Sequence, residues 1–189
     1  MEIMELKKWG RVWHRVKSRT QKDAWATESE VFDLLFGMVR SVKPENVLEI
    51  GTFEGDTAVA MAKALKENGN GHLTTLDIKD YQQENVIEDA GLSDWVKCIK
   101  SNPNEYIDTI PSSSVDFIFI DDGHSYPEVI RDLENAHRLI KPYGYILGHD
   151  ILMVPDVANA FKNFMSRYGK QYESTVISTY DGVFILRRI

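Results

Sequence analysis

The sequence predicts an α/β fold: a doubly wound, mostly parallel sheet of seven strands that ends in a C-terminal hairpin with one antiparallel strand. Apolar runs typical of buried strands alternate along the chain with segments whose apolar residues recur every three to four positions. The 189 residues are 43% hydrophobic and 27% charged, which suits one domain with a sizeable core. No repeat or low-complexity tract interrupts the alternation, and no apolar run approaches the roughly 20 residues that a membrane helix needs.

The first half of the chain is predicted to alternate helices and strands. Glu28–Arg40 places Val31, Leu35 and Val39 on one helical face, and Pro44 follows the end of that helix. The other predicted elements are a buried strand at 46–50, an alanine-rich helix at 56–66 that ends before Gly69-Asn70-Gly71, a strand at 72–77, a helix at 81–90 closed by Gly91, and a short strand at 96–100.

The second half contains the most apolar strand, Val115–Asp121 (VDFIFID). Ser125 is predicted to cap the next helix, with Pro127 and Glu128 in its first turn. There follow a turn at 141–144, a strand at 145–148, a helix at 155–167, and strands at 173–177 and 183–187 around Tyr180-Asp181-Gly182, which predicts a hairpin. The alternation is Rossmann-like, and such sheets bind ligands at the carboxyl ends of their parallel strands.

Charge is unevenly distributed along the chain. Residues 1–25 carry a formal charge of +4 and the remainder carries −11, for a total of −7. We therefore expect a basic amphipathic helical segment at 1–27, followed by a domain at 28–189 whose acidic body argues against nucleic acid as a partner. The N-terminus lacks the apolar stretch of a signal peptide, and the chain has one cysteine, Cys98. We expect a cytoplasmic protein without a membrane partner.

The loop after the first strand reads EIGTFEGDT and begins at Glu49. Gly51 and Gly55 allow a tight turn and close approach of a ligand to the backbone. Phe53 occupies the place of the second glycine in the dinucleotide-binding motif GxGxxG, and the acidic residues of the loop suit a cationic ligand better than a pyrophosphate. Asp77 ends the second strand, where a carboxylate accepts hydrogen bonds from ribose hydroxyls.

This loop, Asp77 and the strand order together resemble the class I S-adenosylmethionine-dependent methyltransferases, whose loop pattern is E-x-G-x-x-x-G. The resemblance extends from about residue 27 to the end of the chain. It implies an S-adenosylmethionine site whose residues are as follows: Glu49 near the methionine part, with Thr57 helping to hold its carboxylate; Gly51, Thr52, Phe53 and Gly55 in the loop; Asp77 on the ribose; Ile78 on the adenine face; Ser101 and Asn102 at the adenine edge; and Asp121 at the end of the fourth strand.

Carboxylates and histidines follow two neighbouring strands. Asp121 ends the fourth predicted strand, His124 comes three residues later, and the next strand ends in His149-Asp150. Adjacent parallel strands lie about 5 Å apart, so Asp121 and Asp150 can converge on one point. Two such close carboxylates repel each other unless a proton or a cation lies between them. Oxygen ligands suit Mg²⁺, and a histidine would also admit Mn²⁺, Fe²⁺ or Zn²⁺.

The segment from Ile120 to Asp150 resembles one branch of that family, the small O-methyltransferases related to macrolide-sugar methyltransferases and to a cephalosporin-biosynthesis protein. The resemblance implies a divalent cation, Mg²⁺ or Mn²⁺, held by Asp121, His149 and Asp150, with His124 as general base. His149 stands where the branch usually has Glu, so it is either a ligand or a residue that contacts one. Tyr143 stands where a glycine is usual.

The predicted activity is metal-assisted methyl transfer from S-adenosylmethionine to the hydroxyl of a small molecule. Two alternatives stay open: a methyltransferase that needs no metal, and a cofactor-binding partner subunit that does not methylate. An NAD-dependent oxidoreductase is disfavoured, because GxGxxG is missing and the loop is acidic. The substrate is not specified by the sequence, and homo-oligomers are compatible with it.

Overall fold

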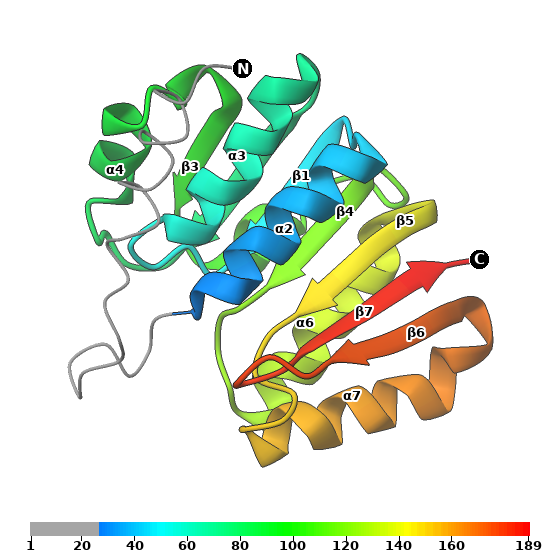
Figure 1. The fold of residues 1–189 in the computed structure, drawn as a ribbon. Coiled ribbons are helices and arrows are strands. Elements are labelled where there is room, and N and C mark those ends of the chain that lie inside the picture. The colour runs from blue at the N-terminus through cyan, green and yellow to red at the C-terminus, as the bar shows by residue number, and fades with distance from the viewer. Residues whose placement is uncertain (1–26) are drawn as a thin grey trace.

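The computed structural model describes residues 27–189, so the predicted basic segment at 1–27 lies almost wholly outside the described residues. One seven-stranded sheet runs through the molecule in the order β3-β2-β1-β4-β5-β7-β6 (Figure 1). Its strands are β1 (Asn46–Ile50), β2 (His72–Asp77), β3 (Val96–Lys100), β4 (Val115–Ile120), β5 (Ile140–Gly148), β6 (Tyr172–Ile177) and β7 (Val183–Arg188). β1 to β5 pair in parallel, and β7 is antiparallel to both β5 and β6, which confirms the predicted fold class.

Helices cover both faces of the sheet, as the alternating pattern predicts. They are α2 (Ser29–Val42), α3 (Asp56–Asn68), α4 (Gln83–Asp89), α5 (Pro103–Ile107), α6 (Tyr126–Leu139) and α7 (Pro155–Tyr168). α2 and α3 pack on one face, and α6 and α7 pack together on the other (Figure 1). The short helix α5 is absent from the sequence prediction, because five residues are too few to show a helical period. In the described chain, no helix combines the length and apolarity needed to cross a bilayer.

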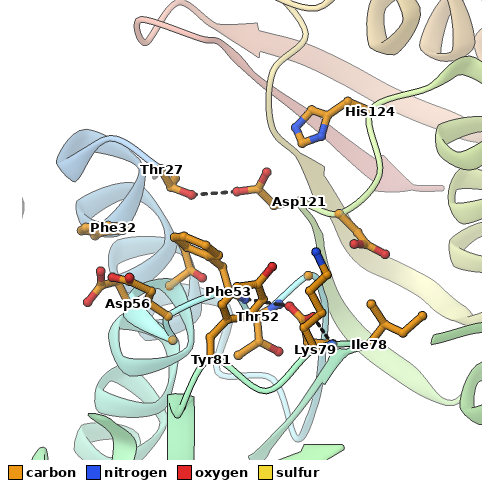
Figure 2. Close-up of a pocket in the computed structure, with 16 residues that line it drawn as sticks. Thr27, Phe32, Thr52, Phe53, Asp56, Ile78, Lys79, Tyr81, Asp121 and His124 are labelled. Atoms are coloured by element: carbon orange, nitrogen blue, oxygen red, sulfur yellow. Dashed lines mark hydrogen bonds between the residues drawn. The ribbon is translucent and has the colours of Figure 1, made fainter. Parts of the chain in front are cut away.

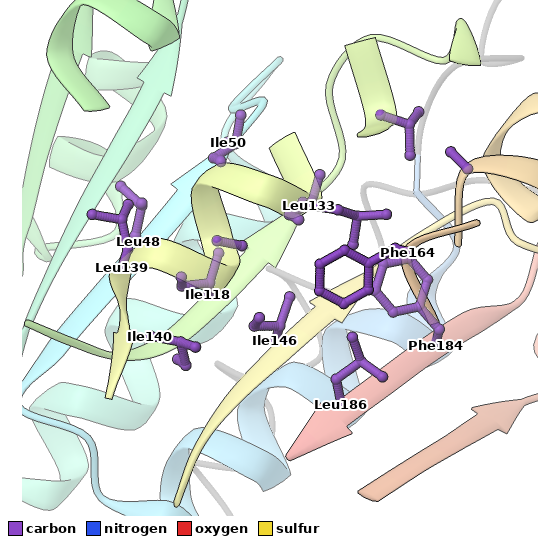
Figure 3. Packing of buried hydrophobic residues seen from close by; sticks show 14 of the residues in the cluster. Leu48, Ile50, Ile118, Leu133, Leu139, Ile140, Ile146, Phe164, Phe184 and Leu186 are labelled. Carbon is purple, nitrogen blue, oxygen red and sulfur yellow. The ribbon is translucent and has the colours of Figure 1, made fainter. Parts of the chain in front are cut away.

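β4 forms the centre of both hydrophobic cores. Its side chains alternate, so Phe117 and Phe119 pack with α2 and α3, whereas Ile118 and Ile120 pack with α6 and α7. Figure 3 shows the second core, in which Phe164 from α7 lies close to residues of β5 and β7. Burial on both faces explains why the last four residues of this strand, 117–120, are all apolar and are followed by carboxylates where the chain leaves the sheet.

One detail of the C-terminal half differs from the prediction, and a second adds to it. The predicted turn at 141–144 is wrong, because these residues belong to β5, whose pairing with β4 shifts between Val115 and Phe117. Tyr143 has φ of 67°, so the strand is locally irregular at this point. Pro142 and Gly144 flank this irregularity, and in the sequence they look like a turn. The predicted hairpin is present at the edge, but its antiparallel strand β7 takes the inner position and β6 the outer one.

α6 begins as the sequence predicts. Ser125 is its N-cap, and Ser125 and Glu128 form a capping box in which Ser125 N donates to Glu128 Oε2 at 3.2 Å. The Ser125 hydroxyl also donates to Glu128 Oε2, at 2.5 Å. This cap fixes the direction in which the chain leaves β4 and thereby positions the short segment that carries His124.

Candidate active site

The carboxyl ends of β1 and β4 are in direct backbone contact. Asp121 N donates to Ile50 O at 2.8 Å, and Gly51 has φ of 95°. A Cβ atom at Gly51 would lie 2.0 Å from the carbonyl oxygen of Asp121. Only glycine fits both this backbone conformation and this approach. Gly51 therefore sets the distance between the predicted cofactor loop and the predicted carboxylate cluster.

Asp77 holds the loop after β1 in place. Its Oδ2 accepts hydrogen bonds from Thr52 N at 3.2 Å and Phe53 N at 2.9 Å, and its Oδ1 accepts one from Lys79 N at 2.8 Å. Phe53, at the position of a glycine in GxGxxG, adopts φ of 46°, a conformation that is unusual for a bulky residue. Asp77 is thus a structural residue of the loop as well as a pocket-lining carboxylate.

Glu49 lies fully buried beneath the loop. Its Oε2 accepts a hydrogen bond from the Thr75 hydroxyl at 2.5 Å, and its Oε1 is a buried atom without a hydrogen-bond partner among the described residues. Burial raises the pKa of Glu49 to about 8, although the hydroxyls of Thr57 and Thr75 lower it and Asp121 raises it further. A buried, incompletely satisfied carboxyl group beside a glycine loop suits a ligand that brings a positive charge or a hydrogen-bond donor.

A cavity of about 380 Å³ opens above this loop (Figure 2). Most of the predicted cofactor residues line it: Gly51, Thr52, Phe53, Gly55, Thr57, Asp77, Ile78 and Asp121. Glu49 lies beneath the cavity instead of in its wall. Ser101 and Asn102 do not line it either: Ser101 N donates to Asp77 O, and the Asn102 side chain caps α5. Their contact with adenine stays a prediction.

Other residues in the cavity wall were missed by the sequence reasoning. Tyr81 packs edge-on against Phe53, with ring centroids 4.8 Å apart, and Lys79 extends into the same space (Figure 2). Phe32 reaches the cavity from α2, and Thr27 precedes that helix. Two aromatic rings beside the exposed Ile78 form an apolar surface that suits a flat heterocycle. Tyr81 follows Asp77 by four residues, but no sequence pattern distinguishes it from an ordinary loop aromatic.

His124 and Asp150 form a close pair at the other side of the cavity. His124 Nε2 lies 2.5 Å from Asp150 Oδ2, and this hydrogen bond raises the pKa of His124 although burial opposes it. Asp150 has φ of 65°, a left-handed conformation that Asp tolerates better than most residues. This turn brings the side chains of Asp150 and its predecessor His149 to the same point, whereas successive side chains of a strand point to opposite faces.

His149 is almost completely buried and faces three carboxylates. Its Nε2 lies 2.7 Å from Glu28 Oε2, and its Nδ1 lies 3.5 Å from both Asp121 Oδ1 and Asp150 Oδ2. Burial alone would lower the pKa of His149, but these partners raise it to about 12. Burial would likewise raise the pKa of Glu28, yet the hydrogen bond with His149 lowers it to about 2. The predicted convergence of Asp121 and Asp150 is thus present, with His149 between them.

The donor set of this cluster fits a divalent cation. A cavity of about 10 Å³, about the room of one water molecule or ion, is lined by Asp121, His124, His149 and Asp150 among others. Two ligands that each lie about 2.1 Å from one ion are at most about 4.2 Å apart. The 3.5 Å separations between His149 Nδ1 and the two carboxylates satisfy this limit. Two pairs of the predicted ligand set therefore meet this limit. Asp121, His124 and Asp150 also offer ligand atoms that all lie within 4.8 Å of one another, so His124 is a competing ligand for the same ion.

Comparison with known proteins agrees with this architecture. A family model described as a methyltransferase domain matches residues 48–151. A curated relative, the ubiquinone/menaquinone biosynthesis C-methyltransferase UbiE of Rickettsia prowazekii, is 30% identical over 104 residues, which are 52% of this chain and 41% of the relative. The match therefore spans about two fifths of that protein's length.

Solved structures resemble the whole fold. The O-methyltransferase TomG of Streptomyces achromogenes, which is involved in tomaymycin synthesis and was solved with S-adenosylmethionine, superposes with a TM-score of 0.75 at 18% identity, covering 100% of this chain and 91% of TomG. An O-methyltransferase of Bacillus cereus solved with S-adenosylhomocysteine gives 0.76 at 20% identity, covering 100% and 92%. The chain belongs to the methyltransferase-domain family and has the fold of the class I S-adenosylmethionine-dependent enzymes.

Proposed function

We propose that this chain transfers the methyl group of S-adenosylmethionine to a hydroxyl of a small molecule. The observation that carries the proposal is the position of the carboxylate–histidine cluster: Asp121 and His124 line both the large cavity and the small one beside it. A base and a set of oxygen ligands thus lie next to the proposed cofactor site. An O-methyltransferase needs this arrangement, because the acceptor hydroxyl must lose its proton close to the methyl donor.

Several features of the large cavity support S-adenosylmethionine as its ligand. Beneath the cavity wall, Glu49 Oε1 is a buried acceptor without a partner among the described residues, behind the glycine loop that the cofactor would contact. Asp77 lines the cavity and would accept hydrogen bonds from the ribose hydroxyls, while Phe53, Ile78 and Tyr81 would offer apolar contacts to the adenine. A volume of about 380 Å³ falls within the roughly 300–1,000 Å³ of small-ligand pockets.

His124 is the proposed general base. When bound, S-adenosylmethionine supplies an electrophilic methyl group, and a divalent cation held by Asp121, His149 and Asp150 would favour ionisation of a hydroxyl. The His124 imidazole accepts the hydroxyl proton, and Asp150, 2.5 Å from Nε2, orients the ring and stabilises the imidazolium that forms. The hydrogen bond with Asp150 raises the pKa of His124, so the pH at which the ring becomes a free base is higher than for an isolated histidine.

Transfer to carbon is the competing activity, because the curated relative UbiE is a C-methyltransferase. That match covers about half of this chain. A carbon acceptor would not need an arrangement of two carboxylates and two imidazoles around a cavity of about 10 Å³. The cluster therefore favours transfer to oxygen.

The test measures cofactor binding and product mass separately. Calorimetry should show that S-adenosylmethionine binds to both the wild type and His124→Ala. On a panel of catechols, sugars and polyols, mass spectrometry should find a methyl ether with the wild type and at least 100-fold slower turnover with His124→Ala. His72→Ala, an exposed histidine at the start of β2, is the matched control and should behave like the wild type.

Four results would contradict parts of the proposal. Products methylated on carbon would refute the choice of acceptor, and full activity of His124→Ala would refute the base. Turnover that survives removal of all divalent cations by a chelator would favour the metal-independent alternative. Tight cofactor binding without turnover on every class of acceptor would favour a non-methylating partner subunit.

A further inference from the structure

Glu28 occupies the N-cap position of α2 but makes no side-chain hydrogen bond to that helix. Glu is not among the residues preferred at N-caps. Its carboxylate instead crosses to residues far along the chain: Oε2 contacts His149 Nε2 at 2.7 Å, and Oε1 accepts from Asp181 N at 3.1 Å. The side chain is only 10% exposed, and a buried carboxylate is costly unless it is paired. Its position therefore calls for an explanation other than helix capping.

The two nitrogens of His149 face different partners. Nε2 points to Glu28, which can only accept a hydrogen bond as a carboxylate, so Nε2 carries a proton. Nδ1 points to Asp121 Oδ1 and Asp150 Oδ2, the proposed ligand oxygens. The neighbouring Thr27 donates to Asp121 Oδ2 at 2.7 Å and so leaves Oδ1 toward His149 (Figure 2). The two residues that lead into α2 thus each hold one member of the ligand set.

We propose that Glu28 is a positioning residue that fixes the His149 ring with its proton on Nε2, so that Nδ1 completes a two-carboxylate, one-histidine site for a transition-metal cation. This inference rests on the proposed function and deepens it, since it concerns the same cation site. Histidines that bind metals commonly donate their other N–H to a carboxylate, which sets the tautomer and the ring orientation. A nitrogen in place of a carboxylate oxygen favours Mn²⁺, Co²⁺ or Zn²⁺ over Mg²⁺.

Two other ligand sets compete for a cation. Asp121, His124 and Asp150 offer ligand atoms within 4.8 Å of one another, and nitrogen coupling that persists in a His149→Glu variant would reveal that set. The second set lies on the opposite side of the His149 ring. Glu28, His149 Nε2 and Asp181 also lie close enough to one another to hold an ion. That side is closed, because all three side chains are largely buried, and Oε1 of Glu28 is already used by a backbone N–H. The Nδ1 side adjoins the cavities that Asp121 and His124 line. A cation there can reach a substrate oxygen, whereas one beside Asp181 could not.

The first experiment measures Mn²⁺ and Mg²⁺ binding to the full chain by calorimetry, with pulsed electron paramagnetic resonance on the Mn²⁺ complex. The wild type should bind Mn²⁺ more tightly than Mg²⁺ and should show nitrogen hyperfine coupling from a coordinated imidazole. Glu28→Gln should weaken Mn²⁺ binding 10- to 100-fold. Glu30→Gln, an exposed carboxylate two residues further on, is the matched control and should leave binding unchanged.

A second variant separates positioning from folding. In a His149→Glu background the third ligand is a carboxylate. It has no ring for Glu28 to orient, and the negative charge of Glu28 would repel it. Glu28→Gln should then strengthen cation binding, the reverse of its effect in the wild type, and the nitrogen coupling should be absent. If Glu28 has only a structural role, Glu28→Gln should weaken cation binding in both backgrounds. A similar loss of cation affinity in the wild type and in His149→Glu would therefore overturn the proposal.

Other outcomes are equally decisive. If Asp181→Asn abolishes Mn²⁺ binding while Asp150→Asn does not, the cation lies on the Glu28 side and the proposal is wrong. If no divalent cation binds but methyl transfer continues, a protonated His149 alone balances the carboxylates; the inference then fails while the proposed methyltransferase function stands. If Mn²⁺ binds as described but no acceptor is methylated, the proposed function fails and the assignment of the cation site survives.

Discussion

Replacement of Glu49 by Gln tests whether this buried carboxyl group governs the pH dependence of stability. Burial raises the pKa of Glu49 from 4.5 to about 8 in the folded protein. A group with a raised folded pKa contributes its full stability below the unfolded value of 4.5 and loses it as the pH rises toward 8. The wild type should therefore lose stability over this range through Glu49, and Glu49→Gln, which cannot ionise, should not.

The size of the effect follows from the shift. The rise from 4.5 to about 8 corresponds, at 1.36 kcal/mol per pKa unit, to at most about 5 kcal/mol above pH 8. Between pH 5 and pH 8 the unfolding free energy of Glu49→Gln should rise relative to that of the wild type by about 2–4 kcal/mol. The amide makes different hydrogen bonds from the carboxyl group and so adds a constant offset. The change of the difference with pH, and not its value at one pH, therefore carries the test.

The assay is urea unfolding of cofactor-free protein at several pH values from 5 to 8, monitored by tryptophan fluorescence. Glu54→Gln removes an exposed carboxylate from the same loop and is the control, for which the difference from the wild type should stay constant. Parallel pH profiles of Glu49→Gln and the wild type would refute the reasoning, because they would show that Glu49 ionises in the folded protein as it does in the unfolded chain.

Three further predictions concern the framework of the site. Gly51→Ala should lower the unfolding free energy by more than about 3 kcal/mol in urea unfolding, because the new Cβ would lie 2.0 Å from Asp121 O. Gly37→Ala is the control and should be neutral or stabilising, because Gly37 lies in a helix with open space around it. Equal effects of the two substitutions would contradict the steric argument. Ser125→Ala should cost about 1 kcal/mol in the same assay through loss of the capping box, and an unchanged unfolding midpoint would show that the cap contributes nothing. Asp77→Ala should weaken S-adenosylmethionine binding at least 10-fold in calorimetry. The substitution removes the acceptor of three backbone N–H groups and the acceptor proposed for the ribose hydroxyls. Retained affinity would exclude this residue from the site.

Local sequence signals predicted the elements well where the signal was long or chemically specific. β4 ends in the four-residue apolar run Phe117–Ile120 and α6 starts at a capping box, and the sequence predicts both to within a residue. Local signals failed where tertiary pairing overruled them: Pro142 and Gly144 indicate a turn, yet the chain at this point continues into β5 along β4. α5 was missed for the opposite reason, since a helix of five residues has too little periodicity to be seen.

Some features of the candidate site follow from the sequence, and others from the tertiary structure alone. The sequence alone determined the glycine loop, the acidic end of β2 and the meeting of Asp121 with Asp150, because the ends of adjacent parallel strands must lie side by side. Only the tertiary structure decided the contact of Glu28 with His149, since the two residues are 121 positions apart and no pattern links them. It also decided the left-handed turn at Asp150 that brings two successive side chains together. Periodicity and strand order are encoded locally, whereas the partner of a buried charge depends on how distant segments pack.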